Sequence, residues 1–289
     1  MAAATAQLLS VEEETVREGM TRLREADKLV TDTLTEIPVA YLPELYGAET
    51  FCCRALTAAA ALHFPAPAGL DRKIAKAAAE AGITYSQEQQ DAIRTAAEQG
   101  LLLITGGPGT GKTTILKGIL NLFDNMGLKT LLAAPTGRAA KRLTEVTGAD
   151  ASTIHRLLEA GIDPATGKMV FARDEDNPLK ADAIIVDEMS MVDVLLLGSL
   201  LRAVPQGKRL ILVGDPDQLP PVGPGAPFSD MLRSGSLPTA RLTEIFRQAQ
   251  KSLIVMNAHR VNQGQFPELR DTNSDFFFLR RQSEESLVQ

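Results

Sequence analysis

Gly106-Gly107-Pro108-Gly109-Thr110-Gly111-Lys112-Thr113 is the stretch of this 289-residue chain that decides its fold. It follows an apolar run, Leu101 to Thr105, and precedes Ile115 to Phe123, where apolar residues recur at helical spacing. When a strand passes through a glycine-rich turn into a helix, the free N–H groups at the helix start can surround phosphate oxygens. The stretch therefore predicts a phosphate-binding loop in an α/β domain.

Further apolar runs alternate with amphipathic helical segments on the carboxyl-terminal side of this loop. They are Thr130 to Ala134, Ala183 to Asp187 and Arg209 to Val213. This alternation predicts a doubly wound parallel sheet with helices on its faces. Between two of the runs, Gly161 to Phe171 carries Gly, Pro and Asp, so we expect a hairpin insertion over about residues 160–181.

The amino-terminal part has helical patterning. Residues 8–35 are charged with apolar positions at helical spacing, and Leu42 to Leu62 is rich in alanine. Both segments predict helices. Pro65 to Gly69 breaks the pattern, which resumes from Asp71 to Ala81, so we expect an N-terminal helical region over residues 1–70.

Charge and cysteine content restrict the class of protein. Ten of the 36 acidic residues but only four of the 30 basic residues lie in the first fifty positions, and the formal net charge is -6. Bulk attraction therefore cannot drive nucleic-acid binding, which would need a local basic groove. The adjacent Cys52 and Cys53 fit neither a disulfide framework nor a metal site. No apolar run is long enough to span a membrane and Met1 to Ser10 lacks signal-peptide features, so we expect a cytoplasmic protein.

The glycine-rich stretch supplies the candidate ligands of ATP and Mg²⁺. The Lys112 ammonium is suited to the outer phosphates and the Thr113 hydroxyl to magnesium. A dinucleotide fingerprint is rejected, because the glycines do not have its spacing and Lys-Thr follows them. The candidate nucleotide-binding residues of the loop are Gly107, Pro108, Gly109, Thr110, Gly111, Lys112, Thr113 and Thr114.

Two carboxylates, Asp187 and Glu188, end the apolar run that starts at Ala183. Ligands of doubly wound sheets bind at the carboxyl ends of the strands, so this pair is expected beside the phosphates. Asp187 would hold the magnesium ion and Glu188 would act as general base toward the attacking water. A solvated acidic pair at a strand end is the alternative.

A family resemblance follows from three further segments. Leu210 to Val222 is an apolar run that enters a proline-stiffened loop, and with residues 187–191 it resembles motif III of superfamily 1 helicases, the RecD-like helicases in particular. Leu242 to Gln248 resembles their motif IV, and Tyr85 to Ile93 resembles their adenine-reading Q motif. The resemblance covers about residues 36–289.

The resemblance implies roles for three polar side chains. Gln89 would read the adenine edge, while Gln218 and Arg247 would contact the γ-phosphate, where an amide can donate and accept and a guanidinium can pair with phosphate oxygens. Surface residues are the alternative for all three. It also implies a first RecA-like motor domain over residues 71–240 and an incomplete second one over residues 241–289, with a strand from Asp275 to Leu279.

A basic segment is the candidate DNA-binding element. Residues 129–156 hold five Lys or Arg against two Asp or Glu, a surplus suited to sequence-independent phosphate contacts. Two of its stretches resemble DNA-contacting helicase motifs, although a solvated helical face is an equally good interpretation and a packed or capping role is the alternative for the histidine. The candidates are Thr136, Gly137, Arg138, Lys141 and His155.

The expected function is that of an ATP-dependent DNA helicase, with 5′ to 3′ movement on single-stranded DNA inherited from the family. Single-stranded DNA and duplex junctions are the expected partners, and recombination or repair partners stay open. The family also implies that the hairpin insertion separates strands. The family places an arginine and further DNA contacts after motif IV, so these 289 residues should bind ATP but hydrolyse it slowly. A nucleotide-gated switch and a single-strand clamp are the alternatives.

Overall fold

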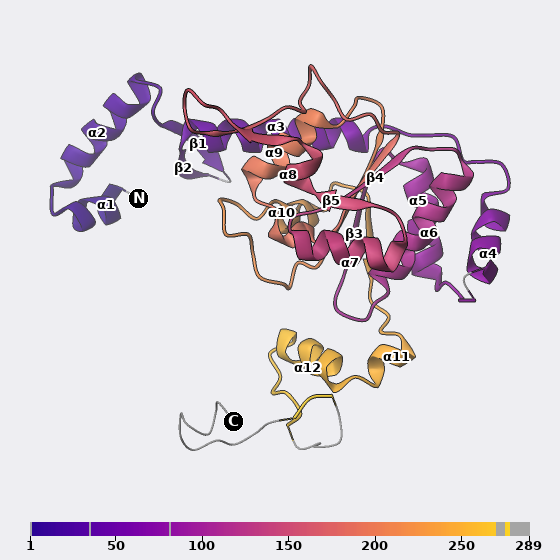
Figure 1. Cartoon of the computed structure of the whole chain (residues 1–289). Helices are drawn as coiled ribbons and strands as arrows, with labels where there is room; N and C mark the ends of the chain where they lie inside the picture. Colours follow the sequence, from indigo (N-terminus) through magenta and orange to yellow (C-terminus); the bar gives the residue numbers. More distant parts are fainter. Residues whose placement is uncertain (1, 35, 81, 270–274, 278–289) are drawn as a thin grey trace.

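A six-stranded parallel sheet forms the centre of the molecule in a computed structural model that describes residues 2–34, 36–80, 82–269 and 275–277 (Figure 1). All neighbouring strands pair in parallel, which confirms the predicted doubly wound sheet. The strand order is β10 (Thr239–Leu242), β3 (Leu101–Gly106), β9 (Arg209–Gly214), β8 (Ala183–Val186), β4 (Thr130–Ala134) and β5 (Ala151–Thr153). The four central strands were predicted, and the two short edge strands, β5 and β10, were not.

Helices cover both faces of the sheet. Successive residues of a strand point to opposite faces, and those of β3 are buried in two separate hydrophobic cores. Leu101 and Leu103 belong to the core that includes α3 (Pro43–Ala60), α9 (Val194–Ala203) and α10 (Pro227–Ser234). Leu102 and Ile104 belong to the second core. That core includes residues of α4 (Leu70–Glu80), α5 (Gln87–Glu98), α6 (Lys112–Asn125) and α7 (Gly137–Thr147).

The amino-terminal region is partly helical. Helices α1 (Ala2–Leu9) and α2 (Glu13–Glu25) pack on each other and project from the body of the molecule (Figure 1). The prediction of helix over residues 8–35 is wrong after α2 ends at Glu25, and β1 (Val30–Leu34) instead pairs with β2 (Ile37–Tyr41) in an antiparallel hairpin. Three of the five residues of β1 are β-branched, as strands favour: Val30, Thr31 and Thr33. The predicted helices over 42–62 and 71–81 are confirmed as α3 and α4.

A hairpin lies within the predicted insertion, whose limits at about residues 160 and 181 stay predictions. Strand β6 (Ala160–Ile162) pairs antiparallel with β7 (Met169–Phe171), after the short helix α8 (Ile154–Leu157). A short 3₁₀ helix, η1 (Met189–Met191), follows β8. The domain borders at residues 70 and 240 stay predictions.

The segment after β10 holds two short helices, α11 (Arg247–Gln250) and α12 (Leu253–Asn262). The predicted strand over residues 275–279 is not seen in residues 275–277, and residues 278 and 279 lie outside the described residues. Asp275 instead caps α12, because its carboxylate accepts from the N–H of Leu253 at 2.7 Å. No helix among the described residues has the length and apolar character to cross a membrane.

Candidate functional site

A cavity of about 1040 Å³ lies where the glycine-rich loop meets the carboxyl ends of the sheet strands. Its walls come from segments far apart in the sequence: the loop, the start of α5, one face of α7, the end of β8, the loop after β9 and the segment after β10. Every predicted ATP-binding loop residue from Gly107 to Thr114 lines it, and so do Asp187 and Glu188. The structure thus brings together the two groups that the sequence assigned to phosphate and metal.

Glycine is required in the loop for conformation and for space. Gly109 and Gly111 have φ values of 76° and 87°, in the left-handed region that side chains disfavour. A Cβ atom at Gly111 would also collide with the Gln89 amide nitrogen and lie 2.9 Å from a ring carbon of Phe246. The loop backbone therefore passes so close to Gln89 and Phe246 that a side chain at residue 111 would not fit, and α6 begins at the next residue, Lys112.

The side chain of Lys112 folds back onto this loop. Its ammonium donates to the carbonyl oxygens of Gly106 and Gly107, and lies 3.9 Å from a carboxylate oxygen of Asp215. Burial lowers the pKa of Lys112, while the carboxylates of Asp215 and Asp187 oppose that shift. A triphosphate in the cavity would offer this buried cation further oxygen acceptors.

The acid pair is held by the backbone at the end of β8. The Asp187 N–H donates to the carbonyl of Ala133 on β4 at 2.9 Å, and its carboxylate accepts from the Glu188 N–H at 2.8 Å. Glu188 has left-handed φ and ψ values of 56° and 41°, an uncommon conformation for a residue with a side chain. Such local strain occurs at functional sites.

The chemistry of these side chains fits a magnesium ion. Burial, reinforced by the Glu188 carboxylate, raises the pKa of Asp187 to about 6, so a cation would stabilise the charged carboxylate. The Thr113 hydroxyl lines the same cavity, and Mg²⁺ prefers such oxygen ligands. Among the described residues no three His, Cys, Asp or Glu side chains form a metal-binding cluster, so water and phosphate oxygens would complete the coordination.

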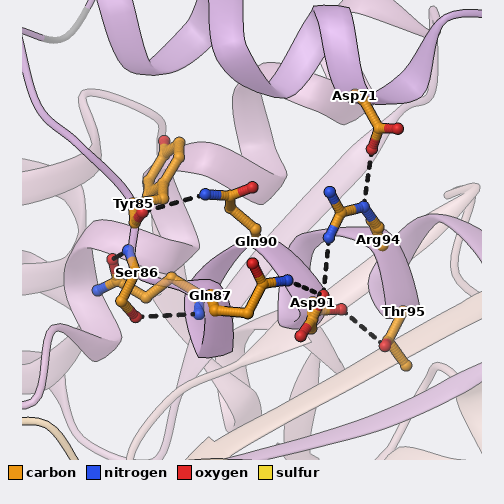
Figure 2. Close-up of polar contacts among 9 residues, drawn as sticks. Asp71, Tyr85, Ser86, Gln87, Gln90, Asp91, Arg94 and Thr95 are labelled. Atoms are coloured by element: carbon orange, nitrogen blue, oxygen red, sulfur yellow. Dashed lines mark hydrogen bonds and ion pairs between the residues drawn. The ribbon is translucent and has the colours of Figure 1, made fainter.

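The start of α5 places Gln89 in the cavity. Ser86 caps the helix: its hydroxyl accepts from the Gln89 N–H at 3.3 Å, and the Gln89 side-chain oxygen accepts from the Ser86 N–H at 3.1 Å. Figure 2 shows this helix start, where Gln90 also bonds to the Tyr85 carbonyl and Arg94 bridges Asp91 and Asp71. Gln89 is 1% exposed, and its side-chain NH₂ has no hydrogen-bond partner. An unpaired donor at a cavity wall is available to a ligand.

Gln218 and Arg247 are the two residues predicted to contact the γ-phosphate, and the structure describes the side chain of Gln218 alone. Gln218 lines the cavity from the loop after β9, where its side chain is exposed. Arg247 begins α11, and its side chain lies outside the described part of the structure. The roles of both stay predictions.

Three residues at or beside the cavity were not singled out from the sequence. Asp215 is 2% exposed and faces Lys112. It directly follows β9 and lies within the segment Leu210 to Val222 that resembles a helicase motif, so the sequence could have identified it. Arg142 lines the cavity four residues after Arg138 on the helix already assigned to DNA. His259 lies with its Nε2 atom 2.9 Å from the Pro108 carbonyl, a contact between segments 151 residues apart that no local pattern predicts.

The candidate DNA-binding residues gather around α7 and α8. Thr136 caps α7 by accepting from the Ala139 N–H, and Gly137, Arg138 and Lys141 are exposed along its first turns. The His155 ring packs against Phe171 of the hairpin, with 5.9 Å between ring centroids. DNA binding by these residues stays a prediction.

Comparisons with known proteins agree with this geometry. A family model described as an AAA domain matches residues 89–224. The ATP-dependent RecD2 DNA helicase of Deinococcus radiodurans is 45% identical over 186 residues, covering 64% of this chain and 25% of that protein. The RecBCD enzyme subunit RecD of Mycolicibacterium smegmatis is 41% identical over 180 residues, covering 54% of this chain and 32% of that protein. The chain thus spans a quarter to a third of the length of these relatives.

Two solved structures with partial likeness to this chain are helicases. The Pif1 helicase from Candida albicans is 26% identical, with a TM-score of 0.45, and the match covers 64% of this chain and 46% of that one. The Pif1 helicase from Bacteroides, solved with ADP-AlF3 and ssDNA, is 24% identical with a TM-score of 0.44, and the match covers 63% and 47%.

Proposed function

We propose that this chain is a member of the RecD-like superfamily 1 helicases, that it binds ATP and Mg²⁺ in the cavity around Lys112, and that it serves as part of an ATP-driven DNA helicase. One observation carries the proposal: the glycine-rich loop and the Asp187-Glu188 pair line a single cavity. Its relatives are described as helicases that use ATP or as subunits of the RecBCD enzyme.

The residues predicted from the sequence would divide the binding of ATP and the transfer of its terminal phosphate among them. The loop N–H groups and Lys112 hold the phosphates, and Thr113 and Asp187 hold the metal ion, which would supply charge neutralisation to the phosphates. Glu188 accepts a proton from the attacking water. Gln218 and Arg247 contact the terminal phosphate. The unpaired NH₂ of Gln89 donates to the adenine ring.

DNA would bind where strand ends and helix starts present phosphate-binding groups. The N-terminus of α7 offers the Gly137 N–H together with Arg138 and Lys141, and α8 adds His155. Exposed Met169 and Val170 on the hairpin could stack against the last base pair of a junction. Single-stranded DNA and duplex junctions are the proposed substrates, with 5′ to 3′ movement.

The proposal is tested by ATPγS binding and by phosphate release with and without single-stranded DNA. The chain should bind ATPγS with Mg²⁺, and Lys112→Ala should abolish that binding. Phosphate release should rise when DNA is added, and slow turnover by these 289 residues remains a prediction of the same assay. A rate of phosphate release that does not change when single-stranded DNA is added would favour the nucleotide-gated switch. Salt-dependent DNA binding without hydrolysis would favour the single-strand clamp.

A further inference from the structure

Helix α7 presents two different faces. Ala139, Arg142, Leu143 and Val146 line the nucleotide cavity, and their spacing places them on one face of the helix. Lys141, whose side chain is 80% exposed, instead approaches Glu145. The same helix therefore carries a cavity-lining guanidinium and, at its start, the residues proposed to hold DNA.

The described residues that line the cavity carry more negative than positive charge. Among the described residues that line it, the cations are Lys112 and Arg142, and the carboxylates are Asp187, Glu188 and Glu244. Lys112 already donates to two loop carbonyls and faces the buried Asp215. A nucleoside triphosphate is still negatively charged after one Mg²⁺ has bound. Binding it in a cavity lined by more carboxylates than cations therefore requires additional positive charge.

Arg142 is free to supply that charge. Within the described residues its guanidinium has no hydrogen-bond or ion-pair partner, unlike Arg94, which bridges two carboxylates. It lines the same cavity as Lys112 and Asp187. The acid pair proposed to hold the metal ion and the attacking water, Asp187 and Glu188, lines that cavity as well.

We propose that Arg142 is a nucleotide-binding residue whose guanidinium contacts the terminal phosphate of a bound nucleoside triphosphate. This inference rests on the proposed function and adds a residue to its site. A guanidinium pairs bidentately with phosphate oxygens and cannot be replaced by lysine without loss of that geometry. Because α7 is one rigid element, this contact also joins the nucleotide to the proposed DNA-binding residues at Thr136 and Arg138.

The test is calorimetric titration of Arg142→Ala with ATPγS and with ADP, both with Mg²⁺. A lost charge-assisted pair should weaken ATPγS binding about tenfold or more, while ADP, which lacks the terminal phosphate, should change by less than about threefold. Arg142→Lys should be intermediate for ATPγS, because it keeps the charge without the fork. Thermal denaturation without nucleotide should be unchanged, since Arg142 is exposed and bonds to none of the residues that the structure describes.

Arg233→Ala is the matched control. It removes the same charge from a side chain that is 77% exposed on α10, outside the cavity, so it should leave both affinities unchanged. The inference is supported when Arg142→Ala loses at least about threefold more affinity for ATPγS than for ADP, and any smaller difference overturns it. If the unaltered chain fails to bind ATPγS, the proposed function itself has failed.

Discussion

Replacement of Gln89 by methionine separates a structural role from recognition of the base. Methionine has a similar length and adapts to irregular packing, so the buried site is expected to stay filled. The Gln89 side chain makes one internal hydrogen bond, from the Ser86 N–H at 3.1 Å, and leaves its NH₂ unpaired in a position that is 1% exposed. The substitution removes both features.

The two effects on stability oppose each other. Loss of the reciprocal cap costs about 1 kcal/mol. Removal of the buried, unpaired NH₂ group stabilises the folded state by about 1 to 3 kcal/mol, because its desolvation no longer opposes folding. We therefore expect Gln89→Met to change the free energy of unfolding by no more than about 1 to 2 kcal/mol, with stabilisation the more favoured direction. Loss of a neutral hydrogen bond to adenine should weaken ATP binding by about tenfold at most.

The assay compares dissociation constants for ATPγS and GTPγS alongside urea denaturation of the nucleotide-free chain. Gln89→Met should lose most of the preference for adenine. Ser86→Ala is the matched control, because it removes the other half of the same cap and does not line the cavity. It should destabilise the chain by about 1 kcal/mol and leave the base preference intact.

A different pattern would refute this reasoning. If Gln89→Met destabilised the chain as much as Ser86→Ala and left the preference between the two bases unchanged, Gln89 would be a capping residue and nothing more.

Three other substitutions probe the site and its support. Glu188→Gln, made in a protein that carries the complete motor, should retain ATPγS affinity but lose at least about 100-fold in steady-state phosphate release, because it removes the general base; unchanged turnover would assign that role elsewhere. Gly111→Ala combines left-handed strain of about 1 kcal/mol with a collision against Gln89, so urea denaturation and ATPγS titration should both show a loss, and a neutral result would contradict the observed backbone. Hydrogen bonds from the Thr243 hydroxyl and N–H lower the pKa of Glu88 below its usual 4.5, so this carboxylate adds stability above that pH and loses it as the pH falls through the lower, folded-state pKa. Glu88→Gln should therefore cost about 1 kcal/mol or less at pH 7, with a cost that shrinks as the pH falls below the usual carboxyl pKa of 4.5; a cost independent of pH would exclude the ionic contribution.

The sequence was most informative where local pattern and burial agree. Leu101 to Ile104 is apolar at each position because β3 is buried on both faces, so the strand could be recognised without knowledge of its neighbours. The same reasoning placed β8 and its terminal carboxylates. Spatial convergence of the loop with Asp187 followed from one rule, that parallel strands end at the same edge of the sheet.

Prediction failed where structure depends on partners distant in sequence. Strands β5 and β10 are three and four residues long, and pairing with β4 and β3 defines them more than composition does. Arg142 entered the sequence analysis only as one of the five basic residues counted over residues 129–156, because a charge count does not show which side of a helix meets a cavity. That orientation is set when α7 packs through Leu143 onto the second core.

The segment after β10 also constrains how nucleotide binding could lead to movement. The Phe246 N–H donates to the Gly109 carbonyl at 3.3 Å, and His259 donates to the Pro108 carbonyl at 2.9 Å. Both contacts use carbonyl oxygens of the loop, whereas phosphates use its N–H groups, so this segment and a nucleotide can occupy the loop together. Lys112 differs, because its ammonium is bonded to loop carbonyls and must turn toward a phosphate. A ligand shifts a conformational equilibrium only through interactions that differ between the two states. Rearrangement on ATP binding should therefore begin at Lys112 and its partner Asp215, while the segment after β10 stays in contact with the loop and can follow it.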